Sequence, residues 1–257
     1  MTSTALKLLA LILMLIDHIA EFIPGTPIWF HWLGRLSAPL FIFCMTWGLS
    51  YTRDRKKYLT RMYCFGALMA VINFICNNAY QNPYCYITNN IFVTLLLIGI
   101  VTSLIELCRQ NRKKGTKYVI LFCIYQIITT LLCIVAKRIL PGIAIKGFIG
   151  AITANIIFCE GSIIFVLLGV LIYFNKESKK KLSYAYGIFC ILFLIMSSIN
   201  NLSIHSLFFI NFQWMMIASL PLMWLYNGKK GIGLKYLFYI FYPTHIIVLY
   251  WVGNLLF

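Results

Sequence analysis

Long apolar stretches recur along the whole chain, and they restrict its possible folds more than any other feature. Stretches of about 17–25 residues are long enough to cross a bilayer as helices. Of the 257 residues, 61% are hydrophobic and only 11% are charged, whereas soluble domains have about 25% charged residues. We therefore predict an all-α, polytopic transmembrane helix bundle of about 9–10 spans, forming one multi-pass cell-membrane domain over residues 1–257.

Nine spans can be located from the apolar runs and the polar loops between them. The run 148–174 is long for one upright helix, and it leaves room for a short re-entrant piece before a span at 157–174. Pro39 is expected to kink or break the second span. The predicted spans are 5–23, 32–52, 62–76, 90–107, 118–136, 157–174, 183–200, 206–226 and 234–256.

Positive charge is concentrated between the spans. The chain has 22 Lys and Arg residues against 6 Asp and Glu, a net charge of +16, and most of the cations lie in loops 53–61, 109–117, 175–181 and 229–235. Basic loops stay on the cytoplasmic side of a membrane. The N-terminus is therefore predicted to be cytoplasmic, and the C-terminus outside. This explains the charge without a nucleic-acid partner, and no nucleic-acid-binding motif is present.

The nine cysteines indicate no metal site. They form no CxxC pair and no His/Cys spacing typical of metal ligands, and most lie within apolar runs, where a free Cys behaves as a small hydrophobe. Cys76 and Cys85 are a candidate exception. They flank a polar loop predicted to lie outside, where a disulfide could persist.

The first span carries three ionisable residues within its apolar run. An ionisable side chain deep in hydrocarbon costs roughly 2.5–3.5 kcal/mol. Asp17 and Glu21 are four residues apart and share a helix face, while His18 lies about 100° round from Asp17. This helix must turn its polar face toward protein or a water-filled cavity.

Three further spans carry polar groups that need partners. Arg35 either snorkels to the interface or pairs with Asp17 or Glu21. Glu160 lies in an otherwise apolar run, where it requires a buried cation. Gln213 is either an amide that joins two helices or a ligand-binding group.

Two more spans carry polar residues, one at its start and the other near its middle. Asn90 begins the fourth span, either as an N-cap or as part of a site. Tyr242 and His245 are three residues apart near the middle of the last span, so they lie on one side of it. By contrast, His31 and His205 are predicted to lie near the membrane interface or a loop, and neither is assigned a role.

These polar groups project to similar depths when each helix rises 1.5 Å per residue. His245 falls near the midplane, and five other residues fall in the outer half. One such group could be structural, but several at one depth indicate a functional site. The outer-half members are Asp17, His18, Arg35, Glu160 and Gln213.

Several motifs together resemble the TraX family of membrane acetyltransferases. They are ALKLLALILMLIDHI, GRLSAPLFIF with GLSYTRDRKKYLTR, NIFVTLLLIG, QWMMIASLPLMWLYNGKKG and LKYLFYIFYPTH. The family is similar to a wider superfamily of multi-span acyltransferases that use cytosolic acyl-CoA, and its founding member acetylates the N-terminus of a conjugative pilin. Where the family often has Asp-Tyr-Gly, this chain has Glu160-Gly161, which keeps the acidic charge.

The resemblance implies acetyl-CoA as co-substrate and no metal. It leaves the acceptor open between a protein amine, a sugar and a lipid-linked glycan. On the cytosolic side, the CoA phosphates would be held by Arg53, Arg55, Lys56, Lys57 and Arg61, although the same residues could serve only to set the orientation. Asn90, Gln213 and Tyr242 are the expected substrate-binding residues.

Acyl transfer needs a base for the acceptor proton and a donor for the oxyanion. His18 is the first candidate base, oriented by Asp17, or by Glu160 or Glu21 if Asp17 pairs with Arg35. His245 is the rival base or a second proton carrier.

Two other functions fit the same residues. The intramembrane Asp, His, Glu and Arg could form the relay of a proton-coupled transporter, although no inverted repeat is visible. The chain could also be a non-catalytic assembly protein.

Overall fold

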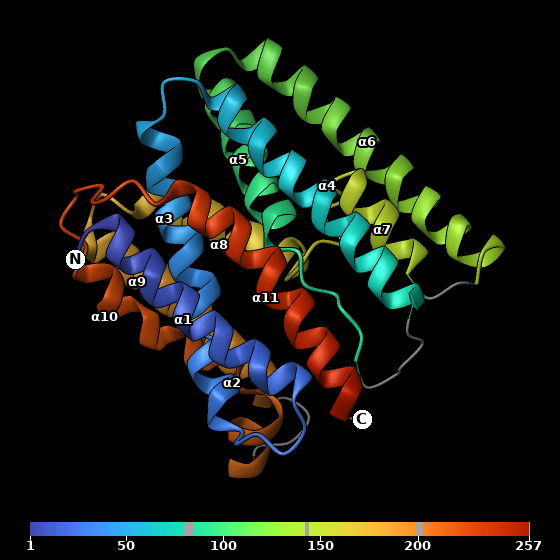
Figure 1. The fold of residues 1–257 in the computed structure, drawn as a ribbon. Coiled ribbons are helices and arrows are strands. Elements are labelled where there is room, and N and C mark those ends of the chain that lie inside the picture. The colour runs from blue at the N-terminus through green and yellow to red at the C-terminus, as the bar shows by residue number, and fades with distance from the viewer. Residues whose placement is uncertain (80–84, 142–143, 199–202, 257) are drawn as a thin grey trace. The chain divides into compact units, whose positions relative to one another are not determined.

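The computed structural model describes residues 1–79, 85–141, 144–198 and 203–256, and every regular element among them is helical (Figure 1). This confirms the predicted all-α class. The chain forms two compact units: unit 1 comprises Met1–Gly48 and Leu171–Phe257, and unit 2 comprises Leu49–Val170. The prediction of a single membrane domain stays a prediction, and each unit is described by itself.

Unit 1 combines the first and the last helices of the chain. α1 packs against α2 and against α11. The N-terminus is tied to the segment before α11, because the backbone amides of Ser3 and Thr4 donate to the carbonyls of Lys229 and Lys230 at 2.9 and 3.1 Å. The elements are α1 (Ser3–Phe22), α2 (Trp29–Gly34), α3 (Ser37–Tyr51, which ends in unit 2), α9 (Lys179–Ser198), a π-helix (Ser206–Ile210), a 3-10 helix (Phe212–Ala218), α10 (Ser219–Trp224) and α11 (Lys235–Leu256).

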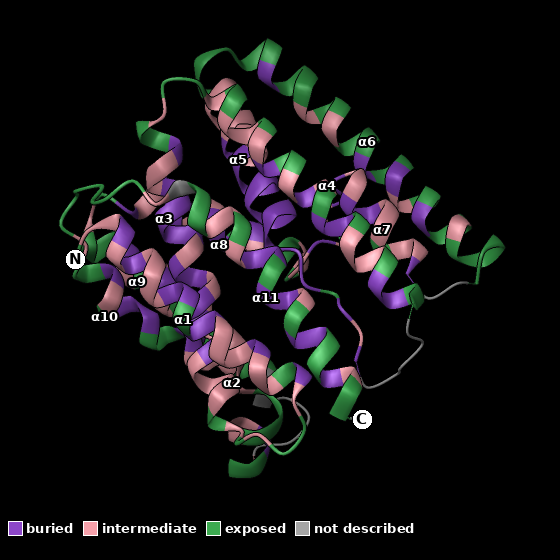
Figure 2. Cartoon of the chain, viewed as in Figure 1, coloured by how far each residue is buried: buried purple, intermediate pink, exposed green. Residues whose placement is uncertain are grey.

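Unit 2 is built around α5. This helix packs against α4 and α6, and the short α7 also contacts both α4 and α6. Figure 2 shows that α5 is largely buried, whereas α6 is mostly exposed. The elements are α4 (Arg55–Ala79), α5 (Ile91–Gln110), α6 (Arg112–Ile139), α7 (Ile145–Ile152) and the start of α8 (Ser162–Asn175, which ends in unit 1).

Four helices of the described chain are long and apolar enough to cross a membrane: α4, α5, α6 and residues Tyr236–Leu256 of α11. The outer side of α6 exposes large apolar side chains, as expected of a helix that faces lipid. The predicted total of 9–10 spans and the cytoplasmic N-terminus stay predictions. The exposed residues on α6 include Ile120, Leu121, Ile124, Ile127, Ile128, Leu131 and Leu132.

The second predicted span is broken, but not at Pro39. The interruption falls at Arg35 and Leu36, between α2 and α3. Pro39 lies in the first turn of α3, where its missing N–H removes no helical hydrogen bond. The prediction that Pro39 breaks this span was therefore wrong in position.

The predicted span 206–226 is also not one helix. It divides into a π-helix, a 3-10 helix and α10, and Asn211 between the first two has a non-helical backbone with φ −116° and ψ 54°. Hydropathy reports how apolar a segment is, and it carries no information about helical pitch. The predicted short piece before span 157–174 is present as the eight-residue α7.

Two of the predicted basic loops are largely helical. α4 begins at Arg55 and α6 begins at Arg112, so most of 53–61 and 109–117 extend the apolar helices instead of joining them. Cys76 and Cys85 are both buried and no disulfide joins them, so the candidate disulfide is not formed. Residues 80–84 of the loop between them, and 199–200 of the predicted span 183–200, lie outside the described residues.

Candidate functional site

An ion pair joins α1 to the break after α2 in unit 1. The Nη2 atom of Arg35 donates to both carboxylate oxygens of Asp17, at 2.9 and 2.7 Å. Both side chains are half-buried, with exposed fractions of 27% for Arg35 and 16% for Asp17. This contact confirms the predicted alternative in which Asp17 pairs with Arg35.

Two further side chains complete this ion pair. His31 Nδ1 lies 2.8 Å from Asp17 Oδ1, and Arg35 Nη1 donates to Gln213 Oε1 at 3.1 Å. The Phe212 ring stacks on His31 and lies beneath the Arg35 guanidinium, with its centroid 5.5 Å from the guanidinium carbon. Asp17 is therefore held by two basic side chains from one short segment.

Gly34 makes this approach possible. A Cβ atom on Gly34 would overlap the side chain of Asp17, so only glycine lets the end of α2 come this close to α1.

A second contact joins α1 to α11. The Nδ1 atom of His18 lies 2.7 Å from the Nε2 atom of His245. Only 5% of His18 and 6% of His245 is exposed. The two rings are nearly parallel, at 7°, and the Tyr242 ring meets both edge-on. The two histidines, which the sequence predicts as rival bases, are therefore direct hydrogen-bond partners.

The hydrogen bonds of the pair fix its tautomers. His245 Nδ1 lies 2.8 Å from the carbonyl oxygen of Phe241, which can only accept, so Nδ1 carries the proton of neutral His245. Its Nε2 must then accept from His18 Nδ1. In the neutral pair, the unprotonated nitrogen of His18 is therefore Nε2, which lies 4.0 Å from Glu21 Oε2.

Glu160 and Asn90 interact with each other in unit 2. The Asn90 backbone amide donates to Glu160 Oε2 at 2.6 Å, and Thr94 Oγ1 donates to the Glu160 carbonyl at 2.6 Å. The Asn90 side chain makes no N-cap bond, and its Nδ2 instead donates to the Gly66 carbonyl at 2.9 Å. Both residues line one cavity, and the predicted role of Glu160 in orienting His18 stays a prediction.

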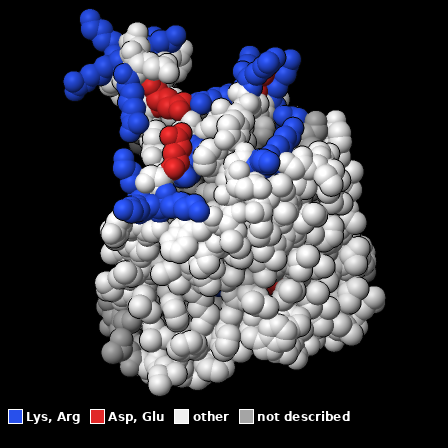
Figure 3. All heavy atoms as spheres, turned by 90° about the vertical axis from the view of Figure 1, so that its left-hand side faces the viewer, with Lys and Arg blue, Asp and Glu red and all other residues white. Residues whose placement is uncertain are grey.

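The basic residues expected to hold CoA lie at the start of α4. Arg55 forms an ion pair with Glu106 of α5, and Lys57 Nζ lies 3.5 Å from Asp54 Oδ2. The Asp54 carboxylate also accepts from the Lys57 backbone amide, which lowers the pKa of Asp54. On the face that Figure 3 shows, charged side chains are confined to a few clusters, and wide areas carry none.

The remaining members of this basic group differ in their surroundings. Arg61 lies over the Tyr58 ring, 5.9 Å from its centroid, whereas Arg53 and Lys56 are exposed. Their predicted contact with CoA stays a prediction.

His31 is the residue that sequence reasoning missed, since it was assigned to the membrane interface. Its spacing carried a usable signal: it lies four residues before Arg35, so both share one helix face. Within the described part of the chain, no group of three or more His, Cys, Asp or Glu side chains could hold a metal ion.

These contacts define a cluster in which His18 Nε2 is a buried proton acceptor and the Arg35 guanidinium is a fixed positive charge. Its members are Asp17, His18, His31, Arg35, Gln213 and His245. We call it the histidine–arginine cluster.

Known proteins resemble this chain over nearly its full length. A protein of Dichelobacter nodosus, "Probable fimbrial assembly protein FimC, serogroup H1", is 25% identical over 256 residues, covering 95% of this chain and 92% of that protein. No solved structure matches the chain significantly. A family described as "TraX protein" matches residues 2–253, so the chain belongs to the TraX family.

Proposed function

We propose that this chain is a membrane-embedded acyltransferase. It moves an acetyl or short acyl group from cytosolic acyl-CoA to an acceptor at or beyond the outer half of the membrane. The observation that carries the proposal is the buried contact between His18 and His245. The acceptor is a protein amine, a sugar or a lipid-linked glycan.

His18 is the general base of the proposed reaction. Its Nε2 has a lone pair in the neutral state, because Nδ1 donates to His245. When Nε2 takes a proton, the imidazolium keeps its bond to His245, and the nearby Glu21 carboxylate stabilises the positive charge. His245 is a positioning residue, since it holds the ring and selects the tautomer.

In the proposed transfer, His18 Nε2 takes up one proton and later gives it back. The acceptor N–H or O–H gives its proton to His18 Nε2 while its heteroatom bonds to the thioester carbonyl carbon. The tetrahedral oxyanion then collapses, the C–S bond breaks, and the CoA thiolate takes the proton back from Nε2. The ring ends neutral, ready for the next acceptor.

Arg35 is the donor proposed for the oxyanion. Its guanidinium donates from Nε to the carbonyl of His31, from Nη1 to Gln213 and from Nη2 to both oxygens of Asp17, and Nη1 carries two N–H groups. One N–H on Nη1 therefore has no partner among the described residues. A fixed positive donor with a spare N–H suits a charge that develops only in the transition state.

A second candidate function is non-catalytic assembly. The observation that favours it is the name of the Dichelobacter nodosus relative, a probable fimbrial assembly protein. An assembly protein needs neither acyl-CoA nor a proton acceptor, so measuring acyl-CoA turnover separates the two functions.

The experiment uses membranes of a strain that lacks the gene, complemented with the full-length chain. Acetyl-CoA labelled in its acetyl group is added, and the label in acceptor fractions is counted. We expect incorporation with the wild type and a rate at least about 100-fold lower with His18→Ala. His205→Ala is the matched control, because His205 is exposed and stacks on Phe209, 5.1 Å away. Equal labelling with wild type and His18→Ala, or none with either, would overturn the proposal.

A further inference from the structure

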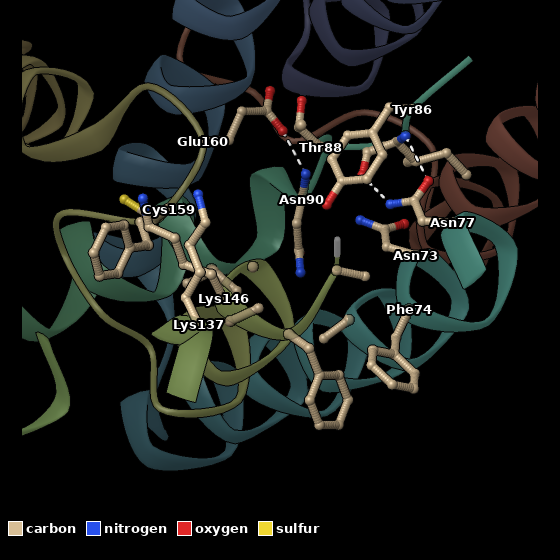
Figure 4. Close-up of a pocket in the computed structure, with 18 residues that line it drawn as sticks. Asn73, Phe74, Asn77, Tyr86, Thr88, Asn90, Lys137, Lys146, Cys159 and Glu160 are labelled. Carbon is tan, nitrogen blue, oxygen red and sulfur yellow. Dashed lines mark hydrogen bonds between the residues drawn. The ribbon is translucent and has the colours of Figure 1, made fainter. Parts of the chain in front are cut away.

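Unit 2 contains a cavity that the proposed reaction does not use. Its volume is about 700 Å³, which is within the range of small-molecule sites. Its walls come from α4, α7, the segment before α5, the end of α6 and the loop before α8. Figure 4 shows Lys137 and Lys146 on one side, Asn73 and Asn77 on the other, and Asn90 between them.

Two amide oxygens at this cavity have no hydrogen-bond partner among the described residues. Asn90 is only 5% exposed, and its Oδ1 accepts nothing from the described residues, although its Nδ2 and backbone N–H are both bonded. Asn73 is similar, since its Nδ2 donates to the Asn89 carbonyl at 3.0 Å while its Oδ1 accepts nothing from the described chain. Both residues line the same cavity, so these oxygens can accept from a ligand that carries hydrogen-bond donors.

Two ammonium groups also line the cavity. Neither Lys137 nor Lys146 forms an ion pair within the described residues. Lys137 lies in the last turn of α6, where the helix dipole favours a cation. Lys146 lies in the first turn of α7, where the dipole disfavours one, so its position has no such explanation. Its Nζ lies over the Phe158 ring, 4.4 Å from the centroid.

The remaining walls include aliphatic, aromatic and hydrogen-bonded side chains. Phe74 and Phe148 pack together, with their centroids 4.9 Å apart. Burial raises the pKa of the Tyr86 phenol, so it remains a neutral hydroxyl at pH 7. Glu160 also lines the cavity, but its Oε2 accepts from the Asn90 amide.

We propose that this cavity binds a phosphate-type anion that carries neighbouring hydroxyl groups. Lys137 and Lys146 hold the anion, and the Oδ1 atoms of Asn73 and Asn90 accept from the hydroxyls. A sugar phosphate and the headgroup of a glycerophospholipid share this chemistry. A protonated amine is disfavoured because two cations already line the walls. Binding requires no acyl transfer, so the proposal stands or falls separately from the proposed function.

The test measures binding to the full-length protein in detergent, without acyl-CoA, by isothermal titration calorimetry. The probes are glucose 1-phosphate, short-chain phosphatidylglycerol, glucose and inorganic phosphate. We expect one of the first two to bind at least about tenfold more tightly than glucose or phosphate alone. Only these two carry both an anion for the lysines and hydroxyl groups for the asparagines. The tighter of the two identifies the source as a soluble sugar phosphate or a lipid.

Variants locate the site. Lys146→Gln and Asn73→Asp should each weaken binding at least about tenfold, the first by removing a cation and the second by adding a repelling charge. Arg138→Gln is the matched control, because Arg138 is exposed and does not line the cavity. Unchanged melting temperatures would show that the variants fold. The proposal is overturned if no probe binds more tightly than phosphate, or if all three variants bind alike.

Discussion

His18 and His245 lie 227 positions apart in the chain, yet their ring nitrogens are 2.7 Å from each other. The contact joins the first long helix to the last, since α1 packs against α11 within unit 1. The Phe241 carbonyl determines the tautomer of His245. Residues of α11 therefore determine which ring nitrogen of neutral His18 carries the proton. A change in α11 is therefore expected to act on chemistry at His18.

Substitutions of the two histidines should have unequal effects on acyl transfer. His18→Ala removes the base, so we expect a loss of about 10²- to 10⁴-fold. His245→Ala leaves the base but removes the acceptor that orients it, so the loss should be smaller. His245→Gln should recover part of the rate, because its amide oxygen can accept from His18 Nδ1. Initial rates with labelled acetyl-CoA measure all three.

The reverse order would change the assignment. If His245→Ala abolished transfer while His18→Ala kept most of it, His245 would be the base. Melting temperatures of the detergent-solubilised variants separate lost chemistry from lost folding.

Arg35→Ala should destabilise unit 1. It leaves the Asp17 carboxylate with His31 as its remaining partner among the hydrogen bonds described above. The pair is partly buried, so the cost should lie between about 1 kcal/mol for an exposed pair and about 3 kcal/mol for a buried one. Arg35→Lys should recover only part of the stability, because one ammonium nitrogen cannot donate to Asp17, Gln213 and the His31 carbonyl from the three positions of the guanidinium nitrogens. Thermal unfolding in detergent measures the difference. Equal stability of wild type and Arg35→Ala would contradict a structural role for this pair.

The sequence was sufficient to predict much of the histidine–arginine cluster. A charge inside an apolar span requires a partner, and projected depth limits which partners can reach it. Asp17, Arg35 and Gln213 were projected to one level, and they form one connected set of hydrogen bonds. Adjacent residues on a helix point apart, which is consistent with the pairing of Asp17 with Arg35.

Depth alone could not choose every partner. Glu160 was projected to the same level, but its described partners are Asn90 and Thr94 of its own unit. Depth gives only the position of a side chain along the membrane normal. Its position within the membrane plane depends on helix packing, which hydropathy does not encode. Likewise, tertiary packing leaves the Oδ1 atoms of Asn73 and Asn90 without a hydrogen-bond partner among the described residues, so no sequence pattern indicated the cavity.

Asn155→Ala should destabilise unit 2. Asn155 is fully buried, and its Nδ2 donates to Thr129 Oγ1 and Thr130 Oγ1 at 2.8 and 2.9 Å, which ties the loop after α7 to α6. Losing these bonds should cost about 2 kcal/mol or more, or about 4 °C in melting temperature. Asn78→Ala is the control, because Asn78 is exposed and donates within its own helix. Equal melting temperatures for both variants would contradict this assignment.

Arg53 and Arg55 should differ in how they affect acyl-CoA binding. Arg53 is exposed, so Arg53→Gln should weaken binding without changing stability. Arg55→Glu should lower the melting temperature, because it faces Glu106, and the double variant Arg55→Glu/Glu106→Arg should restore it. Binding of acetyl-CoA and thermal unfolding are measured on the same samples. If Arg53→Gln bound acetyl-CoA as well as the wild type, the predicted phosphate contact would be wrong.

Gly34→Ala should disrupt the histidine–arginine cluster without changing any of its members. The added Cβ would overlap the Asp17 side chain, so either α2 moves away from α1 or Asp17 leaves Arg35. We expect a lower melting temperature together with lost acyl transfer. Gly187→Ala is the matched control, because Gly187 lies in α9 of the same unit with nothing near its Cβ position. There the change should stabilise the helix by about 0.5–1 kcal/mol. Two equally active and equally stable variants would show that close approach at Gly34 is not required.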